Sequence, residues 1–254
     1  MMCGLPRAAA WCARRGLPGT VGSTRRGLAG QMGSSLPPLI FESDALLIRS
    51  SPVTPFQMNQ YLLGCKQSGE AALIDTGDDD AKRWIEAAAD DGLTIRQILL
   101  THGHVDHVAG LAATKQLLPD VPSRLHPADG WTLRSAPAQG VLFGFGCPIL
   151  PAADAELHDG EIICIGELEV HAIHTPGHAP GHCVFHLPQH DVLFAGDLLF
   201  RGSIGRTDFP GCDSGKMQQS LQRVMALPSE TRVYPGHMGG TTLGAEARMN
   251  PFLA

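Results

Sequence analysis

The stretch Thr101-His102-Gly103-His104-Val105-Asp106-His107 places three imidazoles and one carboxylate between positions 102 and 107. It ends an apolar run over residues 94–101, which predicts a buried strand, and a helix is predicted over residues 108–118. Histidine and aspartate side chains are common ligands of borderline metal ions such as zinc. The stretch therefore predicts a metal site on a strand-to-helix turn, where Gly103 is expected to relieve backbone strain.

Three further metal-binding side chains each follow a glycine shortly after a predicted strand. His178 ends Thr175-Pro176-Gly177-His178, Asp197 ends Ala195-Gly196-Asp197, and His237 ends Pro235-Gly236-His237. The strands before them are predicted over residues 168–174, 192–195 and 232–234. Loops at the carboxyl ends of strands gather at one edge of a sheet protein, so we expect these three residues to converge on the 102–107 turn.

The order of predicted elements indicates an α/β protein. Strands over 45–48, 59–64 and 70–75 precede a helix over 80–90, the strand over 94–101 and the helix over 108–118. A second set follows, with strands over 161–164, 168–174, 183–187 and 191–195, a helix over 214–226 and a strand over 232–234. Residues 136–155, rich in Pro, Gly and Ala, predict a loop at the rim of a substrate pocket. This order suits two face-to-face sheets with helices outside, a four-layer αβ/βα sandwich over residues 39–254.

Composition excludes several classes of protein. The 254 residues are 43% hydrophobic and 17% charged, as in a globular domain. The net charge is −6, and it becomes −11 without residues 1–41, which carry five arginines and no acid. Such an acidic body argues against nucleic acid as a partner. The apolar runs are too short for a membrane helix, and the seven cysteines, without a C-x-x-C pair, are expected to be free thiols.

Residues 1–38 have the composition of an organellar transit peptide. They are rich in Arg, Ala, Gly and Ser and contain no acidic residue. Arginine is more frequent than either serine or threonine there, which favours the mitochondrion over the plastid. The alternative is a disordered extension, which would leave the protein in the cytoplasm.

The motifs T-H-G-H-V-D-H, T-P-G-H, A-G-D and P-G-H, in that order, resemble those of the metallo-β-lactamase-fold hydrolases from about Glu42 onward. This resemblance implies two divalent metal ions, with zinc expected and iron as the alternative. Asp75, in Leu73-Ile74-Asp75-Thr76-Gly77, matches the Asp-Thr-Gly element that braces the ligand turn from behind the metal ligands. The implied ligands are His102, His104 and His178 for one metal, Asp106, His107 and His237 for the second, and Asp197 between them.

Two further stretches are similar to the glyoxalase II-like branch, whose members include hydroxyacylglutathione hydrolases. They are Gly202-Ser203-Ile204-Gly205-Arg206-Thr207-Asp208-Phe209-Pro210 and the region from Thr242 to Phe252. Only 17 residues follow His237, which resembles the short, single-domain members that lack the helical glutathione-binding domain. The branch implies a small-molecule thioester or glutathione conjugate as substrate.

The resemblance also implies a mechanism. A hydroxide that bridges the two metals would attack the thioester carbonyl, with Asp106 orienting it as well as binding metal. The leaving thiolate, with a pKa of about 8.5, needs little help from a general acid. Arg206 is a candidate for binding a substrate carboxylate, and the alternative is a structural ion pair with Asp208 or Asp213.

Two other functions stay open at this point. The persulfide dioxygenases of the same branch contain a similar Gly-Arg-Thr-Asp-Phe element, and a single Fe(II) would then lie on His102, His178 and Asp197. Ser203-Ile204, Pro210 and Gly239-Gly240 look more like the hydrolases. An inactive metal-binding scaffold is the third alternative, although every implied ligand position holds a suitable residue.

Two residues beside the implied ligands have less definite roles. His182 either lines the pocket or makes a local hydrogen bond, and the local bond is expected. Cys183 has no activating neighbour in the sequence, so we expect it to be a small core residue.

Overall fold

The computed structural model of the chain describes residues 35–253. The fold lies within a compact unit that runs from Leu36 to Ala254. The transit peptide expected over residues 1–38 lies, apart from residues 35–38, outside the described residues. Among the residues described, no helix combines the length and the apolar character needed to cross a membrane.

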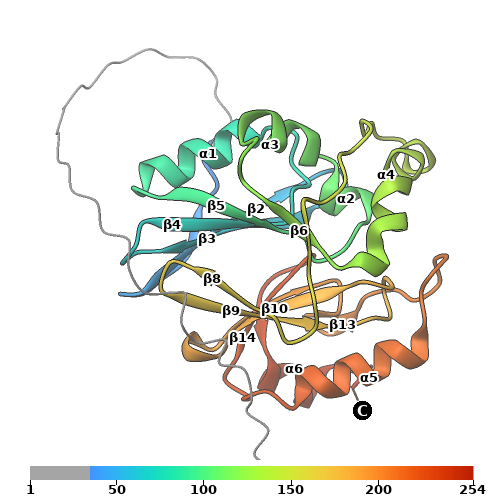
Figure 1. Cartoon of the computed structure of the whole chain (residues 1–254). Helices are drawn as coiled ribbons and strands as arrows, with labels where there is room; N and C mark the ends of the chain where they lie inside the picture. The colour runs from blue at the N-terminus through green and yellow to red at the C-terminus, as the bar shows by residue number, and fades with distance from the viewer. Residues whose placement is uncertain (1–34, 254) are drawn as a thin grey trace, which may run out of the picture. The chain divides into compact units, whose positions relative to one another are not determined.

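Two sheets face each other at the centre of this unit (Figure 1). The first has seven strands in the order β1 (Leu39–Glu42), β2 (Leu46–Val53), β3 (Met58–Cys65), β4 (Glu70–Ile74), β5 (Thr94–Leu99), β6 (Ser123–Leu125) and β7 (Ala155–Glu156). The second has six, in the order β15 (Thr241–Thr242), β14 (Arg232–Pro235), β11 (Val192–Gly196), β10 (Cys183–Leu187), β9 (Leu168–His174) and β8 (Ile162–Ile165). A separate small hairpin joins β12 (Leu199–Phe200) to β13 (Ser203–Ile204).

Helices cover the outer faces of both sheets (Figure 1). On the first sheet lie α1 (Ala81–Asp90) and α3 (Leu111–Leu117), and on the second lie α5 (Ser214–Met225) and α6 (Leu243–Met249). At one end of the first sheet are α2 (Val105–Val108) and α4 (Gly130–Phe143), and short 3-10 helices lie at η1 (Pro127–Asp129) and η2 (Pro188–His190). The expected four-layer αβ/βα sandwich is confirmed.

Strand β4 shows how the sequence builds the layers. Ala72 and Ile74 face the core between the sheets, which also contains Phe185 and Phe194. Ala71 and Leu73 point the other way, into the core beneath α1. Successive side chains of a strand point to opposite faces, so a strand covered on both sides is apolar throughout.

The helix predicted over residues 108–118 is two helices. The chain already becomes helical at Val105 and breaks before Leu111. The amide of Gly110 donates to the carbonyl of Thr76 at 2.7 Å, and a Cβ at Gly110 would lie 1.7 Å from the carbonyl oxygen of Asp78. This close approach of the β4–α1 loop interrupts the helix, and the sequence pattern does not show it.

The prediction of a loop over residues 136–155 is wrong for the first half of that range. Residues 136–143 belong to α4, which contains Pro137, and residues 144–154 have neither helix nor strand. Leu133 and Ala136 of α4 are buried against Ile98 and Val105. Tertiary packing of that face outweighs the low helix propensity of proline and glycine. The other predicted elements are confirmed, with β9 and β10 at their predicted bounds.

Strand directions bring the four ligand-bearing turns together. Strands β9 and β11 are both antiparallel to β10, and β14 is parallel to β11, so these three strands end at one edge of their sheet. In the first sheet, β4 and β5 are parallel and also end together. The turns after β5, β9, β11 and β14 carry the metal-binding motifs.

Removal of the Trp84 side chain tests the packing of α1. Trp84 is fully buried, and its indole N–H donates to Asp78 Oδ2 at 2.9 Å. Trp84→Ala is expected to lower the free energy of unfolding by about 3–5 kcal/mol, because it leaves a cavity under the helix. Chemical denaturation measures the change. Lys82→Ala, on the exposed face of the same helix, should change it by less than about 0.5 kcal/mol.

Candidate metal centre

The seven side chains expected to bind metal meet at the shared edge of the two sheets. Three overlapping groups have ligand atoms that all lie within 4.8 Å of one another. The first group is His102, His104 and His178, the second is Asp106, His107 and His237, and the third is His102, His107 and Asp197. Each group combines residues of the 102–107 turn, which follows a strand of the first sheet, with one residue from a turn of the second sheet. The site therefore forms only when the two sheets pack together.

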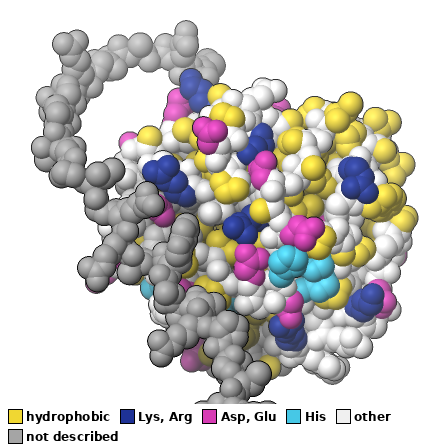
Figure 2. Space-filling view, in the orientation of Figure 1, with side chains coloured by type: hydrophobic (Ala, Val, Ile, Leu, Met, Phe, Trp, Pro, Cys, Tyr) yellow, Lys and Arg dark blue, Asp and Glu magenta, His cyan; other side chains and the backbone are white. Residues whose placement is uncertain are grey.

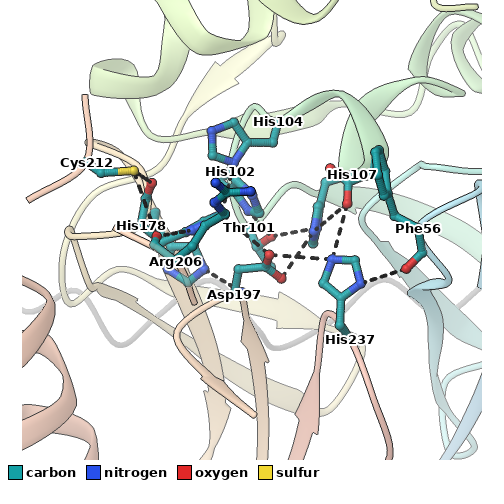
Figure 3. A network of polar contacts seen from close by, with 12 residues as sticks. Phe56, Thr101, His102, His104, His107, His178, Asp197, Arg206, Cys212 and His237 are labelled. Atoms are coloured by element: carbon teal, nitrogen blue, oxygen red, sulfur yellow. Dashed lines mark hydrogen bonds and ion pairs between the residues drawn. The ribbon is translucent and has the colours of Figure 1, made fainter. Parts of the chain in front are cut away.

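Asp197 lies between the two outer groups (Figure 3). Its Oδ2 is 3.4 Å from His178 Nε2 and 3.5 Å from His237 Nε2, and its Oδ1 is 3.3 Å from His107 Nε2. Asp106 is farther to one side, with Oδ2 3.2 Å from His237 Nε2. A carboxylate in the position of Asp197 can contact two metal ions at once.

Four of the histidines are oriented by an acceptor on the side away from the centre. In each the Nδ1 atom contacts an oxygen, which leaves Nε2 facing inward. A ring nitrogen that donates outward fixes the tautomer in which the inner nitrogen has a free lone pair. The contacts are His102 with the Thr101 hydroxyl at 3.0 Å, His107 with Asp75 Oδ2 at 2.8 Å, His178 with the Arg206 carbonyl at 2.8 Å, and His237 with the Phe56 carbonyl at 3.1 Å.

The inner atoms lack the partners that buried polar atoms normally have. His102 Nε2, His107 Nε2 and Asp197 Oδ1 are buried and have no hydrogen-bond partner among the described residues. An unsatisfied buried polar atom is costly, and a cation among these lone pairs would satisfy all three. This donor set of imidazole and carboxylate groups fits a pair of zinc or iron ions.

The electrostatics of the site differ between its histidines. Burial lowers the pKa of His102 well below its ordinary value and that of His104 to about 3, so both are neutral at pH 7. Burial opposes the charge of Asp197, but His107, His178 and His237 outweigh it and lower the pKa of that carboxyl. The carboxylates that face His107 and His237 outweigh burial and raise the pKa of both imidazoles, so a metal ion that binds there must displace a proton.

Asp75 holds the ligand turn to the end of β4. Its Oδ1 accepts from the backbone N–H of Thr101 at 2.7 Å, and its Oδ2 accepts from the Thr101 hydroxyl at 2.9 Å and contacts His107 Nδ1 at 2.8 Å. Asp75 is 2% exposed and has a left-handed backbone with φ of 61°. This carboxylate therefore sets the position of the turn and the orientation of His107 together.

His182 positions Asp197 and does not line the pocket. Its Nε2 accepts from the backbone N–H of Asp197 at 3.0 Å, and its Nδ1 contacts the Thr175 hydroxyl at 2.9 Å. Burial lowers the pKa of His182 well below its usual value, so the ring stays neutral. The expected local hydrogen bond is confirmed. Cys183 beside it is buried in the core, which raises the pKa of its thiol.

Asp129 is a positioning residue that sequence reasoning missed. It is fully buried, and its two oxygens accept from the backbone N–H groups of Gly103 and Gly181, each at 2.7 Å. It thus joins the 102–107 turn to the loop after His178. The only signal in the sequence is an acidic residue before the Gly-Trp start of α4, which by itself indicates a helix start.

Gly103 serves a purpose other than the expected relief of strain. Its φ is not in the left-handed region, whereas a Cβ there would lie 2.6 Å from the backbone nitrogen of Leu133. The ligand turn packs directly on α4, and only glycine leaves room for that approach.

Arg206 forms an ion pair with Asp208, which was the alternative to its candidate role in binding a substrate carboxylate. Its Nε and Nη2 donate to the two carboxylate oxygens of Asp208 at 2.6 and 2.7 Å, and its guanidinium lies 3.8 Å from the ring centroid of Phe209. Asp213, the other candidate partner, instead accepts from the backbone N–H of Lys216 at the start of α5. Arg206 also lines the pocket above the metal centre.

A pocket of about 660 Å³ opens directly onto the centre. Its floor contains His104, Asp106, His178, Asp197 and His237. Its sides come from α4, from the β13 hairpin strand with residues 206–210, and from Phe56, Phe200 and Met238. Residues 136–155 were expected to form part of the pocket rim, and of these Ala138, Gln139, Leu142 and Phe143 line the pocket.

Comparisons with known proteins assign the family. The model of the metallo-beta-lactamase superfamily matches residues 53–237, so the chain belongs to that superfamily. Hydroxyacylglutathione hydrolase GloC of Haemophilus influenzae is 37% identical over 209 residues, which cover 80% of this chain and 95% of GloC. The chain lies in the glyoxalase II-like branch, near the persulfide dioxygenases.

Two solved structures support the same assignment. TTHA1623, crystallised in a di-iron-bound form, has a TM-score of 0.74 and 41% identity, with 80% of this chain and 99% of that chain covered. ETHE1 from Myxococcus xanthus has a TM-score of 0.66 and 27% identity, with 80% and 83% covered. The superfamily and its hydrolase relatives identify a metal-dependent hydrolase class, and the His and Asp clusters suit two metals.

Replacement of Asp129 tests its positioning role. Asp129→Ala leaves the amides of Gly103 and Gly181 without an acceptor, so metal affinity should fall about 10–100-fold. Titration with zinc, followed by competition with a chromophoric chelator, measures the affinity. Asp120→Ala, at an exposed position, is the control. Unchanged metal affinity in Asp129→Ala would show that the two loops hold their positions without it.

Proposed function

We propose that this protein is a metal-dependent thioester hydrolase that acts on small-molecule acyl thioesters of the hydroxyacylglutathione type. The observation that carries the proposal is the complete double set of ligands, with His107, Asp106 and His237 beside the His102 group, under an open pocket. The similarity to a protein named hydroxyacylglutathione hydrolase supports the thioester class.

The proposed cofactor is a pair of divalent ions. We expect zinc, and the likeness to a protein crystallised with two irons supports iron as the alternative. When bound, such ions supply Lewis acidity, which polarises a carbonyl and activates water near neutral pH. His102, His104 and His178 would hold one ion, Asp106, His107 and His237 the other, with Asp197 between them.

The chain's own residues orient the reactants. Asp106 lines the pocket beside Asp197, so its carboxylate can accept a hydrogen bond from the attacking water and direct the oxygen at the carbonyl carbon. The water releases one proton to the solvent as its oxygen bonds to that carbon, and the carbon–sulfur bond then breaks to give a carboxylic acid and a thiolate. The leaving thiolate has a pKa of about 8.5 and departs without a general acid.

A second candidate is a persulfide dioxygenase. The likeness to ETHE1 favours it, and His102, His178 and Asp197 would then hold one Fe(II). In that reaction His104, Asp106, His107 and His237 would have no ligand role. Their convergence on the same site is the reason that we place the hydrolase first.

The decisive experiment follows S-lactoylglutathione absorbance with purified protein under anaerobic conditions. We expect turnover that is lost after chelation and restored by added zinc or iron. No anaerobic turnover, together with oxygen uptake on glutathione persulfide, would transfer the assignment to the dioxygenase. Metal-loaded protein that catalyses neither reaction would instead support an inactive metal-binding scaffold.

Replacement of the central carboxylate tests the two-metal arrangement. Asp197→Ala removes the side chain that faces His107, His178 and His237, so bound metal should fall by half or more and activity at least about a hundredfold. Elemental analysis and the thioester assay measure both. Asp44→Ala, at an exposed position, should change neither. Full metal content and full rate in Asp197→Ala would contradict the ligand assignment.

We also propose that residues 1–38 direct the protein to the mitochondrion, on the basis of their composition. A fluorescent protein fused after residue 38 should enter mitochondria, and a fusion that begins at residue 39 should stay in the cytoplasm. Equal distribution of the two fusions would contradict the proposal.

A further inference from the structure

The metal centre lies under walls that are apolar. One wall comes from α4, with Trp131, Leu142 and Phe143, the last residue of the helix. The facing wall has Ile204, Phe209 and Pro210. Phe143 and Phe209 meet edge to face, with ring centroids 6.0 Å apart, so the two walls touch at this point. Figure 2 shows hydrophobic side chains gathered on the surface over α4. The reacting group therefore approaches the polar floor between hydrocarbon side chains.

The wall side chains of α4 recur at helical spacing and are exposed. Trp131, Ser135, Ala138 and Leu142 all line the pocket, at intervals of three or four residues. The exposed fractions of Trp131 and Leu142 are 57% and 78%. Large side chains held in water along one helix face gain free energy when an apolar ligand covers them.

The pocket offers little to an anionic carrier. Among the described residues that line it, Arg206 is the one lysine or arginine, and Asp208 already accepts from two of its three donating nitrogens, Nε and Nη2. The other charged lining residues are Asp106 and Asp197 on the floor. Glutathione has two carboxylates, and recognition of a carboxylate normally uses a free arginine fork or several amide donors. Charge pairing therefore contributes little to binding here.

We infer that the specificity of this pocket is for thioesters with a bulky apolar acyl group, such as an arylacetyl or medium-chain acyl group, and that the thiol carrier contributes little. The inference rests on the proposed thioester hydrolase function and replaces the hydroxyacyl group named there with an apolar acyl group. The acyl group would lie between α4 and residues 204–210, with the carbonyl over the floor.

A matched set of four substrates tests the inference. Phenylacetyl and lactoyl groups are each joined to glutathione and to the neutral thiol N-acetylcysteamine, and kcat/KM is measured with the metal-loaded full chain. With either thiol, the phenylacetyl thioester should be hydrolysed at least about tenfold more efficiently than the lactoyl one. With either acyl group, exchange of the thiol should change kcat/KM by less than about threefold.

Neighbouring residues of α4 provide the matched variants. Leu142 lines the pocket, whereas Val141, 83% exposed, does not. Leu142→Asn should lower the phenylacetyl-to-lactoyl ratio of kcat/KM about fivefold, mainly through a higher KM for the phenylacetyl thioester. Val141→Asn changes polarity equally at the next position and should leave the ratio as in the wild type.

The outcomes separate the inference from the function beneath it. Turnover with lactoylglutathione as the best substrate, and a tenfold loss when glutathione is exchanged for N-acetylcysteamine, would overturn the inference and leave the hydrolase in place. Equal ratios in both variants would also overturn the assignment of the acyl group to the α4 wall. No turnover of any of the four thioesters would overturn the hydrolase and the inference together.

Discussion

The site depends on one buried carboxylate, that of Asp75. It holds the backbone and hydroxyl of Thr101 and the outer nitrogen of His107, so it ties the end of β4 to the turn after β5. Five imidazoles and two further carboxylates must then point at one small volume from four separate turns. They can do so because each turn has its own brace, and a brace fixes a ligand only when it is itself buried and satisfied.

The other braces follow the same rule. Asp129 joins the 102–107 turn to the loop after His178, and His182 holds the amide of Asp197. Both are buried, and neither lines the pocket. The inward atoms are left without partners inside a rigid shell, which is the arrangement that a metal ion completes. The cost of those unpaired atoms is offset only when the ion binds.

The pocket above the centre has two parts with different chemistry. The floor is polar and would supply the groups for hydrolysis, whereas the walls are mainly aromatic and aliphatic and come from elements that hold no candidate ligand. Under the proposed function, reaction type and substrate preference are therefore set by different segments. The motifs of the four turns are those of the superfamily, and α4 with residues 204–210 forms the pocket walls through which we infer that substrates are selected.

The sequence by itself determined the candidate ligands and the layer order. The 102–107 turn and the Gly-His and Gly-Asp pairs after strands are local signals, because each ligand follows the strand that aims it. Apolar runs between turn residues likewise predicted most strands, and helical periodicity predicted helices α1 and α5. These features depend on residues that are close together in the chain, so they can be predicted from the sequence alone.

Only the tertiary structure decided the remainder. Helix α4 was predicted as a loop, since Pro137 and several glycines disfavour a helix, and packing of Leu133 and Ala136 on β5 and α2 reverses that preference. The roles of Asp129 and Gly103, and the pairing of Arg206 with Asp208, depend on which segments meet across the fold. Such contacts join residues that are distant in sequence, or they pair a residue with one of several near neighbours. Neither hydrophobic periodicity nor motif spacing shows which partner is used.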